Sequence, residues 1–270
     1  MITSASNPRI KRIIQLRDKA KMRREEDVFI VEGVRMFLEA PEKSVQELYL
    51  SEKFFHHADT ECMEKIKRLE SKQGLKTELI TDDLFDKISS TVTPQGILCV
   101  IRQLHYTMDD LLKTEAPLLV IVENLQDPGN LGTIFRTAEG AGVDGIIMNR
   151  DTADLTNPKT IRSTMGSVYR VPFIITEHLE QEIKMLKQNR ITVFAAHLSG
   201  KDIYDGVSFL GGSAFLIGNE GNGLTKEVAE LATEKIKIPM EGKVESLNAA
   251  IASSLLVYEA RRQRKAGKIL

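Results

Sequence analysis

Polar residues follow an apolar run in the segment 122–142 (VENLQDPGNLGTIFRTAEGAG) of this 270-residue chain. The run is typical of a buried strand, and a helix is expected from near Asn130, a residue type that suits an N-cap. Arg136 is the lone cation of that helix. Because open α/β sheets bind ligands beyond the carboxyl ends of their strands, Arg136 is a candidate functional residue. The alternative is a surface arginine, or an ion pair with Glu123 or Glu139.

A second segment, 214–224 (AFLIGNEGNGL), runs from an apolar strand into a glycine-rich loop with one carboxylate, Glu220. Glycine lets backbone approach a ligand closely and adopt positive φ, so Gly218, Gly221 and Gly223 suit a binding loop. The alternative is a tight turn between a strand and a helix.

A third segment, 236–258 (IKIPMEGKVESLNAAIASSLLVY), ends a strand at Pro239 and opens a helix of small residues after a loop. Small residues allow another helix or a loop to pack closely. The alternative is an ordinary capped helix with Ser246 as its N-cap.

Two other sequence patterns do not predict a functional site. Residues 140–145 match G-x-G-x-x-G, but they follow a helix and lead into a strand, the reverse of a dinucleotide-binding turn. Gly140 and Gly142 are therefore expected to cap and turn a helix. The histidines and cysteines lack metal-ligand spacing, and the pair His56–His57 is expected to be exposed near a turn.

Strands alternate with helices in both halves of the chain, which predicts an α/β fold. In the second half they predict a mostly parallel sheet covered on both faces. The strands are expected at 28–31, 48–50, 77–80, 96–101, 118–122, 145–148, 171–175, 192–196, 214–217 and 235–238. The helices are expected at 8–24, 61–73, 82–89, 130–140, 158–165, 177–188, 226–232 and 247–265. The polar stretch 102–116 separates two domains, 1–101 and 117–270.

The net charge of −1 conceals an uneven distribution. Residues 1–24 hold eight Lys or Arg and one acid, and residues 259–270 hold five and one, so the remainder is acidic. Basic ends can bind a polyanion, although charged helix faces are also common on ordinary surfaces. The composition (42% hydrophobic, 28% charged) argues against disorder and against a disulfide scaffold. Two cysteines, no expected membrane span and no expected signal segment favour a cytoplasmic location.

Together and in this order, the three segments resemble the SpoU (TrmH-like) RNA ribose 2′-O-methyltransferases of the SPOUT class. The first resembles N-x-x-D-P-x-N-x-G-x-x-x-R-T-A from Asn124 to Ala138. The second resembles G-x-E-x-x-G, and the third resembles I-P-M…S-L-N-x-A. Residues 1–101 resemble an L30e-like RNA substrate-binding domain, through S-x-x-N-P-x-[IV]-K from Ser4 and F-I-V-E-G from Phe29.

The resemblance implies an α/β trefoil knot that binds S-adenosyl-L-methionine and no metal. The implied cofactor-binding residues are Gly218, Asn219, Gly223, Ile238, Met240 and Leu247. The implied catalytic residues are Arg136, Asn130, Glu220, Ser246 and Asn248. Arg136 either acts as an unusual base for the 2′-hydroxyl or clamps the adjacent phosphate and stabilises the developing alkoxide. A guanidinium rarely gives up its proton and binds phosphate with a fork of donors, which favours the clamp.

The resemblance also implies a homodimer formed through the C-terminal domain and an RNA substrate, with 23S rRNA favoured over tRNA. The basic N-terminal helix would contact RNA phosphates through Arg9, Lys11, Arg12, Arg17, Lys19 and Arg23. A non-catalytic RNA-binding dimer is the alternative from another functional class.

Overall fold

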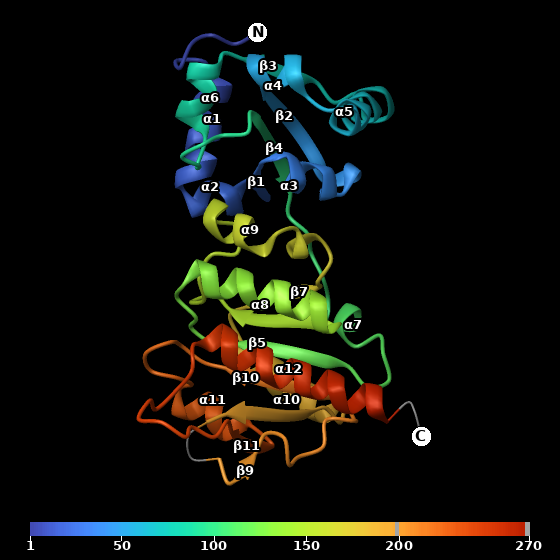
Figure 1. Ribbon diagram of the computed structural model, residues 1–270, viewed down its shortest axis with the longest axis vertical. Helices are drawn as coiled ribbons and strands as arrows, with labels where there is room; N and C mark the ends of the chain where they lie inside the picture. The colour runs from blue at the N-terminus through green and yellow to red at the C-terminus, as the bar shows by residue number, and fades with distance from the viewer. Residues whose placement is uncertain (198–199, 268–270) are drawn as a thin grey trace. The chain divides into compact units, whose positions relative to one another are not determined.

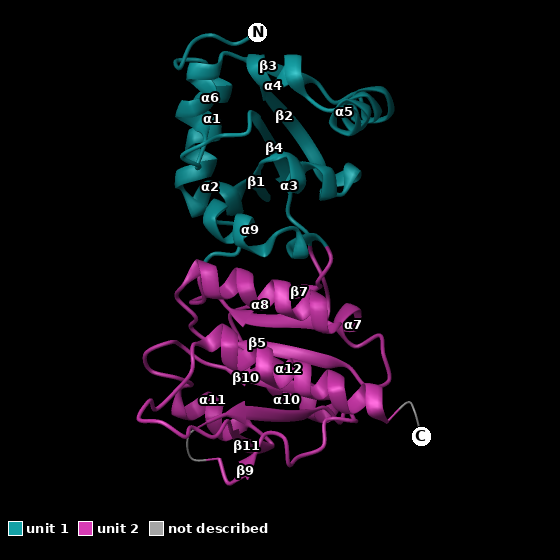
Figure 2. Ribbon diagram, in the orientation of Figure 1, with its two compact units in different colours: residues 1–104, 154–169 teal, residues 105–153, 170–270 magenta. Residues whose placement is uncertain are grey.

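The computed structural model describes residues 1–197 and 200–267. These form two compact units, shown in separate colours in Figure 2. Unit 1 contains Met1–Leu104 and Asp154–Tyr169, and unit 2 contains His105–Ala153 and Arg170–Leu270. The segment Asp154–Tyr169, which the sequence analysis placed with residues 117–270, packs with unit 1 instead.

The sheet of unit 1 has four strands in the order β1-β4-β2-β3. They are β1 (Val28–Glu32), β2 (Val45–Ser51), β3 (Thr77–Ile80) and β4 (Ile97–Arg102). β4 pairs antiparallel with β1 and β2, whereas β3 pairs parallel with β2. Each of the four strands expected in this region is present.

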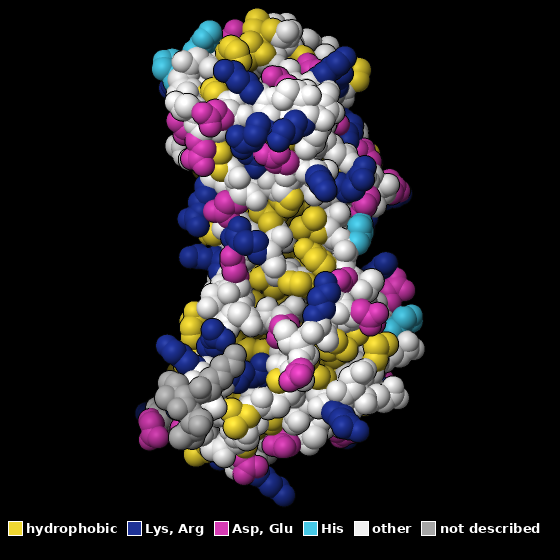
Figure 3. All heavy atoms as spheres, turned by 90° about the vertical axis from the view of Figure 1, so that its right-hand side faces the viewer, with side chains coloured by type: hydrophobic (Ala, Val, Ile, Leu, Met, Phe, Trp, Pro, Cys, Tyr) yellow, Lys and Arg dark blue, Asp and Glu magenta, His cyan; other side chains and the backbone are white. Residues whose placement is uncertain are grey.

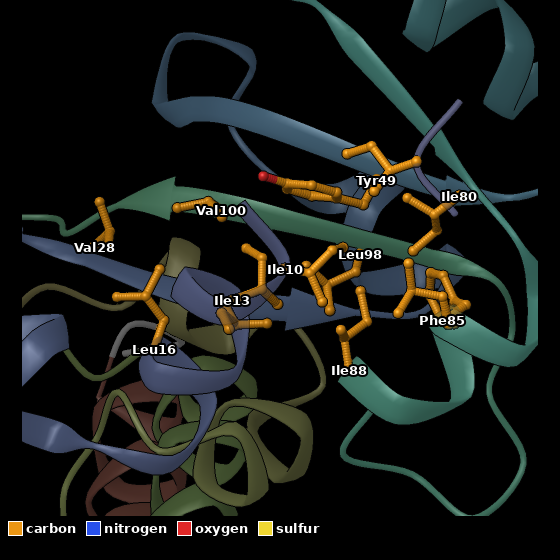
Figure 4. Packing of buried hydrophobic residues seen from close by; sticks show 13 residues of the cluster. Ile10, Ile13, Leu16, Val28, Tyr49, Ile80, Phe85, Ile88, Leu98 and Val100 are labelled. Atoms are coloured by element: carbon orange, nitrogen blue, oxygen red, sulfur yellow. The ribbon is translucent and has the colours of Figure 1, made fainter. Parts of the chain in front are cut away.

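The helices of unit 1 pack on this sheet. They are α1 (Pro8–Asp18), α2 (Ala20–Glu25), α3 (Val34–Glu39), α4 (Glu52–His57), α5 (Thr60–Gln73), α6 (Asp82–Ile88) and α9 (Pro158–Thr164). Short 3₁₀ helices lie at Glu42–Ser44 and Ser167–Tyr169. Ile10, Ile13 and Leu16 lie on one face of α1 and pack into the core with Tyr49 and Leu98 (Figure 4).

The single helix expected at 8–24 is two helices, because Lys19 adopts an extended conformation (φ −120°) that ends α1. The break lets Arg23 point inward, where 2% of its surface is exposed. Its guanidinium donates to Thr156 Oγ1 at 3.0 Å, to Asp154 Oδ2 at 2.5 Å and to the carbonyls of Leu16 and Arg17. Arg23 therefore holds the segment that begins at Asp154 in unit 1.

Unit 2 is built on a seven-stranded sheet in the order β7-β6-β5-β10-β8-β11-β9, in which every strand pairing is parallel. The sequence analysis missed only the two-residue strand β9. The seven strands are β5 (Leu118–Val122), β6 (Gly145–Asn149), β7 (Phe173–Thr176), β8 (Thr192–Ala196), β9 (Asp202–Ile203), β10 (Ser213–Ile217) and β11 (Glu234–Lys237). The expected α/β fold with a mostly parallel sheet is confirmed.

Helices cover both faces of this sheet: α7 (Met108–Leu111), α8 (Pro128–Ala141), α10 (Leu179–Gln188), α11 (Lys226–Leu231) and α12 (Ala249–Ala266). Residues of α10 and α11 pack on the face that Leu119 and Ile121 share. α8 and α12 lie side by side (Figure 1), and α12 also contacts β5 and β10. The expected linker 102–116 includes α7, because Leu111 is buried in the core of unit 2. No helix among the described residues is both long and apolar enough to cross a membrane.

The structure shows where the glycines of 140–145, the histidine pair and the two cysteines lie. Gly142 ends α8 with φ +69°, as expected, but Gly140 lies inside that helix. His56 and His57 are exposed at the end of α4. Cys62 and Cys99 are buried free thiols, and burial raises the pKa of Cys99 to about 12. Lys268, in the basic C-terminal run, lies outside the described residues.

Candidate active site

Three loops leave the carboxyl ends of strands at one edge of the unit 2 sheet. They follow β5, β10 and β11 and contain residues 123–127, 218–225 and 238–248. Because carboxyl ends of parallel strands lie at the same edge, segments far apart in sequence meet there. Hydrogen bonds between these loops and the adjoining helices define the site.

Glu123 ties the first loop to the second. Its side chain is 4% exposed and accepts from the backbone nitrogen and the hydroxyl of Thr225, at 2.8 and 2.6 Å. A buried carboxylate is stable only with such donors. The expected alternative, an ion pair between Glu123 and Arg136, does not form in the part of the chain that the structure describes. The partner of Glu123 is Thr225, which lies about one hundred residues away in the chain, so no local sequence pattern indicates this contact.

Asn124 adds a second tie and turns the chain sharply, with a φ of +55°. Its carbonyl accepts from Asn219 Nδ2 at 2.8 Å, and its backbone nitrogen donates to Asn149 Oδ1 at 2.9 Å. Asn219 also orders its own loop, because its Oδ1 accepts from the backbone nitrogens of Gly221 and Asn222. Asn219 therefore stabilises the second loop and also joins it to the first.

Gly218 lies where the backbone of the second loop folds back on itself. A Cβ at this position would lie 2.2 Å from the carbonyl carbon of Gly223 and 2.3 Å from the nitrogen of Leu224. Gly223 has a φ of +69°, which favours glycine. Two of the predicted loop glycines are thus required by the loop's own geometry.

Glu220 is exposed and directs its carboxylate toward the start of α8. It accepts from the backbone nitrogens of Gln126 and Asp127, both at 3.0 Å, and from Asn130 Nδ2 at 2.9 Å. Partial burial opposes ionisation, but these hydrogen bonds outweigh it and lower the pKa of Glu220 below its ordinary value. Glu220 is therefore suited to holding the first loop as an anion.

Asn130 connects the first and third segments. Its Oδ1 accepts from Asn248 Nδ2 at 2.9 Å. The expectation that Asn130 caps α8 is wrong, because Asp127 is the N-cap and accepts from the backbone nitrogen of Asn130. The expectation that Ser246 caps the last helix is also wrong, because Asn248 caps α12 and accepts from the nitrogens of Ala250 and Ile251.

A cavity of about 290 Å³ lies among the second and third loops. It is lined by the six residues expected to bind a cofactor, together with Glu220 and Ser246. Arg136, Asn130 and Asn248 do not line it. Lining residues that the sequence analysis did not name include Ala196, His197, Lys237, Glu245, Ala249 and Ala252. They come from the ends of β8 and β11, from the third loop and from α12, and no local motif marks them.

Arg136 lies on the exposed face of α8. Within the described residues, its side chain has no hydrogen bond or ion pair. Both proposed carboxylate partners are engaged elsewhere, since Glu139 pairs with Arg170 and Glu123 bonds Thr225. The structural ion pair considered for Arg136 is therefore absent, and its guanidinium faces solvent.

The basic residues of the N-terminal helices differ from what their sequence pattern indicated. Arg12 bonds Glu26 and Glu47, and Arg17 bonds Asp18 and the carbonyl of Lys87. Arg9 pairs with Glu78. The expectation that Arg23 contacts an RNA phosphate is wrong. Its guanidinium is buried and already donates to four acceptors. Lys11 and Lys19 are exposed. Figure 3 shows cationic and anionic side chains interspersed on the face it presents.

An α/β fold whose parallel sheet carries a cavity among the loops at its carboxyl edge is a scaffold that binds ligands at that edge. Comparison with known proteins is more specific. Residues 117–258 match the SpoU rRNA Methylase family, and residues 7–99 match the MRM3-like substrate binding domain. The chain belongs to the SpoU rRNA methylase family, and the resemblance stated from its motifs is confirmed.

Similar proteins cover nearly the whole chain. The 23S rRNA (guanosine(2553)-2′-O)-methyltransferase RlmP of Bacillus subtilis is 31% identical over 96% of this chain and 98% of its own. A crystal structure of an rRNA methyltransferase from Sinorhizobium meliloti is 30% identical, with a TM-score of 0.84 over 97% of this chain and 96% of its own. The SpoU methyltransferase AviRb of Streptomyces viridochromogenes, in complex with AdoMet, is 26% identical, with a TM-score of 0.84 over 96% of this chain and 99% of its own.

Proposed function

We propose that this protein transfers a methyl group from S-adenosylmethionine to a ribose 2′-hydroxyl of RNA, with 23S rRNA as the substrate. The observation that carries the proposal is the set of three loops bonded together around one cavity, with the free guanidinium of Arg136 on the helix that follows the first loop. Family membership and the RNA named for the RlmP relative support the same reaction.

The cavity has the chemistry that S-adenosylmethionine requires. Gly218, Ile238 and Leu247 offer backbone and apolar surface to a flat adenine. Glu245 and Lys237 offer opposite charges to the ammonium and carboxylate of the methionine part. Its volume of about 290 Å³ is close to the lower end of ligand pockets, about 300 to 1,000 Å³. When bound, the cofactor supplies an electrophilic methyl group on a sulfonium.

Arg136 acts on the RNA side of this reaction. Because methyl transfer from a sulfonium would release a neutral thioether, the protein needs no strong acid. Its residues must align the ribose hydroxyl and allow the loss of the hydroxyl proton. A guanidinium rarely gives up its proton in a protein, so it is a poor base and a strong phosphate ligand. We therefore assign Arg136 as a clamp that holds the adjacent phosphate and stabilises the developing alkoxide, while the hydroxyl proton leaves by another route, to solvent water. Direct proton removal by Arg136 is the alternative.

The other four residues implied as catalytic have different roles in this proposal. Glu220, Asn130 and Asn248 form one hydrogen-bonded chain, which makes them positioning residues for the first loop and for the start of α12. Ser246 lines the cavity and is available to contact the cofactor or the ribose. Gly223 and Met240 complete the cofactor contacts, and Asn219 orders the second loop through its bond to Gly221.

We further propose that residues 1–101 form an RNA substrate-binding domain, that 102–116 link it to the catalytic domain, and that 117–270, of which 154–169 pack with unit 1, form a trefoil knot. The match of residues 7–99 to a substrate binding domain supports the first assignment. The exposed Lys11 and Lys19 are the candidate phosphate contacts on α1 and its end, with smaller contributions from the acid-paired Arg9, Arg12 and Arg17.

A homodimer in the cytoplasm completes the proposal. Ile251, Leu255 and Tyr258 project from one face of α12 and are 50%, 36% and 52% exposed. Their spacing of four and three residues places them in a stripe on the helix surface. Burial of this apolar stripe against a second copy would stabilise a dimer through the C-terminal domain.

The test is methyl transfer from labelled S-adenosylmethionine to 23S rRNA and, in parallel, to tRNA. We expect label in a ribose 2′-oxygen of 23S rRNA. Mapping 2′-O-methyl positions in rRNA from cells with and without the gene identifies the nucleotide. Transfer to tRNA alone would show that tRNA, and not 23S rRNA, is the substrate. No transfer, together with no heat of cofactor binding at millimolar concentration, would favour a non-catalytic RNA-binding dimer.

A further inference from the structure

A second cavity, of about 500 Å³, lies within unit 1. α4, the first turns of α6 and the segment 94–96 line it. The side chains that supply its chemistry are Lys53, Phe54, His57, Asp82, Asp86 and Gln95. None of them belongs to the basic helices α1 and α2 or to the site of unit 2.

Local geometry builds the wall of this cavity. The buried Ser51 caps α4, and its hydroxyl accepts from the backbone nitrogen of Phe54 at 3.1 Å. The backbone nitrogen of Lys53 donates to Asp82 Oδ1 at 3.0 Å, which joins α4 to α6. Gly96 has a φ of +84°, and a Cβ there would lie 2.6 Å from Phe54 Cβ. Glycine at 96 therefore lets α4 approach β4 closely.

The lining side chains combine an aromatic surface with both charges. Phe54 is partly exposed, and the ring of His57 is oriented by a 2.8 Å hydrogen bond between its Nδ1 and the carbonyl of Lys53. Lys53 and Asp86 are exposed, and neither side chain has a hydrogen bond or ion pair among the residues that the structure describes. Donors, acceptors and a π-surface are thus available to a ligand.

This combination matches one kind of ligand in RNA. Unstacked bases stack on aromatic side chains and are read by hydrogen bonds at their edges. A carboxylate accepts from the exocyclic amino group of a base, and an ammonium contacts the neighbouring phosphate. Free phosphate alone would be repelled by the two aspartates, and an apolar ligand would offer no donor to the carboxylate of Asp86.

We propose that this cavity binds an unstacked, amino-bearing nucleobase of the RNA substrate. Phe54 supplies the stacking surface, Asp86 accepts from the amino group, and Lys53 contacts the adjacent phosphate. The proposal rests on the RNA substrate assigned under Proposed function, and it gives unit 1 a role in reading a base, in addition to the phosphate contacts proposed for α1. Arg12, Arg17 and Arg23 are already bonded to acceptors within unit 1.

Paired variants of the full-length protein test the cavity. Phe54→Leu removes the π-surface and Asp86→Asn removes the anionic acceptor. Phe55→Leu and Asp83→Asn are matched controls, because both residues are exposed neighbours that do not line the cavity. Thermal melts establish that all four variants fold. We expect each cavity variant to raise the KM for RNA about fivefold to a hundredfold, with kcat and the KM for S-adenosylmethionine unchanged.

Binding of short oligonucleotides separates this proposal from the proposed reaction. Wild-type protein should bind oligo(C) more tightly than oligo(U) in fluorescence anisotropy, and Asp86→Asn should reduce that preference. Equal RNA KM and equal oligonucleotide binding in cavity variants and controls would overturn the cavity assignment while methyl transfer by the wild type stands. Absence of transfer by the wild type would overturn the reaction, and the binding preference would still decide the cavity.

Discussion

The side-chain amide of Asn130 donates to Glu220 Oε1 at 2.9 Å and joins residues 90 positions apart in the chain. The same side chain accepts from Asn248, so one asparagine links all three segments that were recognised separately in the sequence. This arrangement makes the loops a single mechanical unit, and changes at one loop should affect the others.

Arg136→Ala should abolish methyl transfer and preserve cofactor affinity. Arg136 lies outside the cavity and has no partner among the described residues, so its removal disturbs neither the loops nor the fold. We expect kcat to fall by at least about a hundredfold, as for other groups that stabilise developing charge. Single-turnover rates and calorimetric titration with S-adenosylmethionine measure the two effects separately.

Arg136→Lys distinguishes the two versions of its role. Lysine keeps a charge but loses the planar fork, so a clamp predicts weak partial activity with a raised KM for RNA. Full activity in Arg136→Ala would remove this residue from the mechanism altogether.

Glu220→Gln should weaken the site in a pH-dependent manner. The pKa of Glu220 is lowered, so the stability that its ionised form contributes is present above the ordinary value of 4.5 and is lost as pH falls through the lower folded pKa. The difference in unfolding free energy between wild type and variant should therefore be largest above pH 4.5 and should decrease as the pH is lowered. Denaturant unfolding at several pH values measures it.

Glu241→Gln is the matched control, since Glu241 is exposed on the third loop and lies outside the cavity lining. A difference that stays constant or grows on acidification in Glu220→Gln would contradict the assigned role of the carboxylate.

Gly218→Ala should abolish cofactor binding with little change in overall secondary structure. The new methyl group would lie 2.2 Å from backbone of Gly223, so the second loop must move. Gly221→Ala is the control, because its Cβ would meet only Asn219 Oδ1 at 3.5 Å. Calorimetric titration of both variants is the measurement, and wild-type affinity in Gly218→Ala would show that the loop is not part of the cofactor site.

Arg23→Met should destabilise unit 1 by about 3 kcal/mol, because it leaves Asp154 Oδ2 and the carbonyls of Leu16 and Arg17 without the donor that Arg23 supplies. Arg24→Met, at an exposed neighbouring position, should change stability by less than about 0.5 kcal/mol. Chemical denaturation of the two variants compares them. If Arg23 were instead a phosphate ligand, its loss would weaken RNA binding and leave stability unchanged.

Ile251→Glu should convert the proposed dimer into monomers, because it introduces a charge into the apolar stripe of α12. Met185→Glu, on another exposed apolar position, is the control and should leave the dimer intact. Sedimentation velocity distinguishes the species. Sedimentation of the wild-type protein as a monomer would show that the stripe is not a dimer interface.

Much of the fold could be predicted because its signals are local. The continuous apolar run at Leu118–Val122 and the alternation of elements correctly indicated a buried parallel sheet. Gly142 was identified because helix ends favour glycine with positive φ. Helix starts were harder, since several residue types cap equally well, and Asp127 and Asn248 were the N-caps where Asn130 and Ser246 were expected.

The sequence by itself determined most of the element types, the three motifs, the family and those cavity-lining residues that belong to the motifs, because each depends on residue types at short spacing. Only the tertiary structure decided which groups are paired: Glu123 with Thr225, Asn130 with Glu220 and Asn248, and Arg23 with Asp154. These pairs join residues about 90 to 130 positions apart. A charge pattern does not reveal whether folding will bring an acceptor to an arginine, and for this reason Arg23 is a buried anchor whereas Arg136 faces solvent.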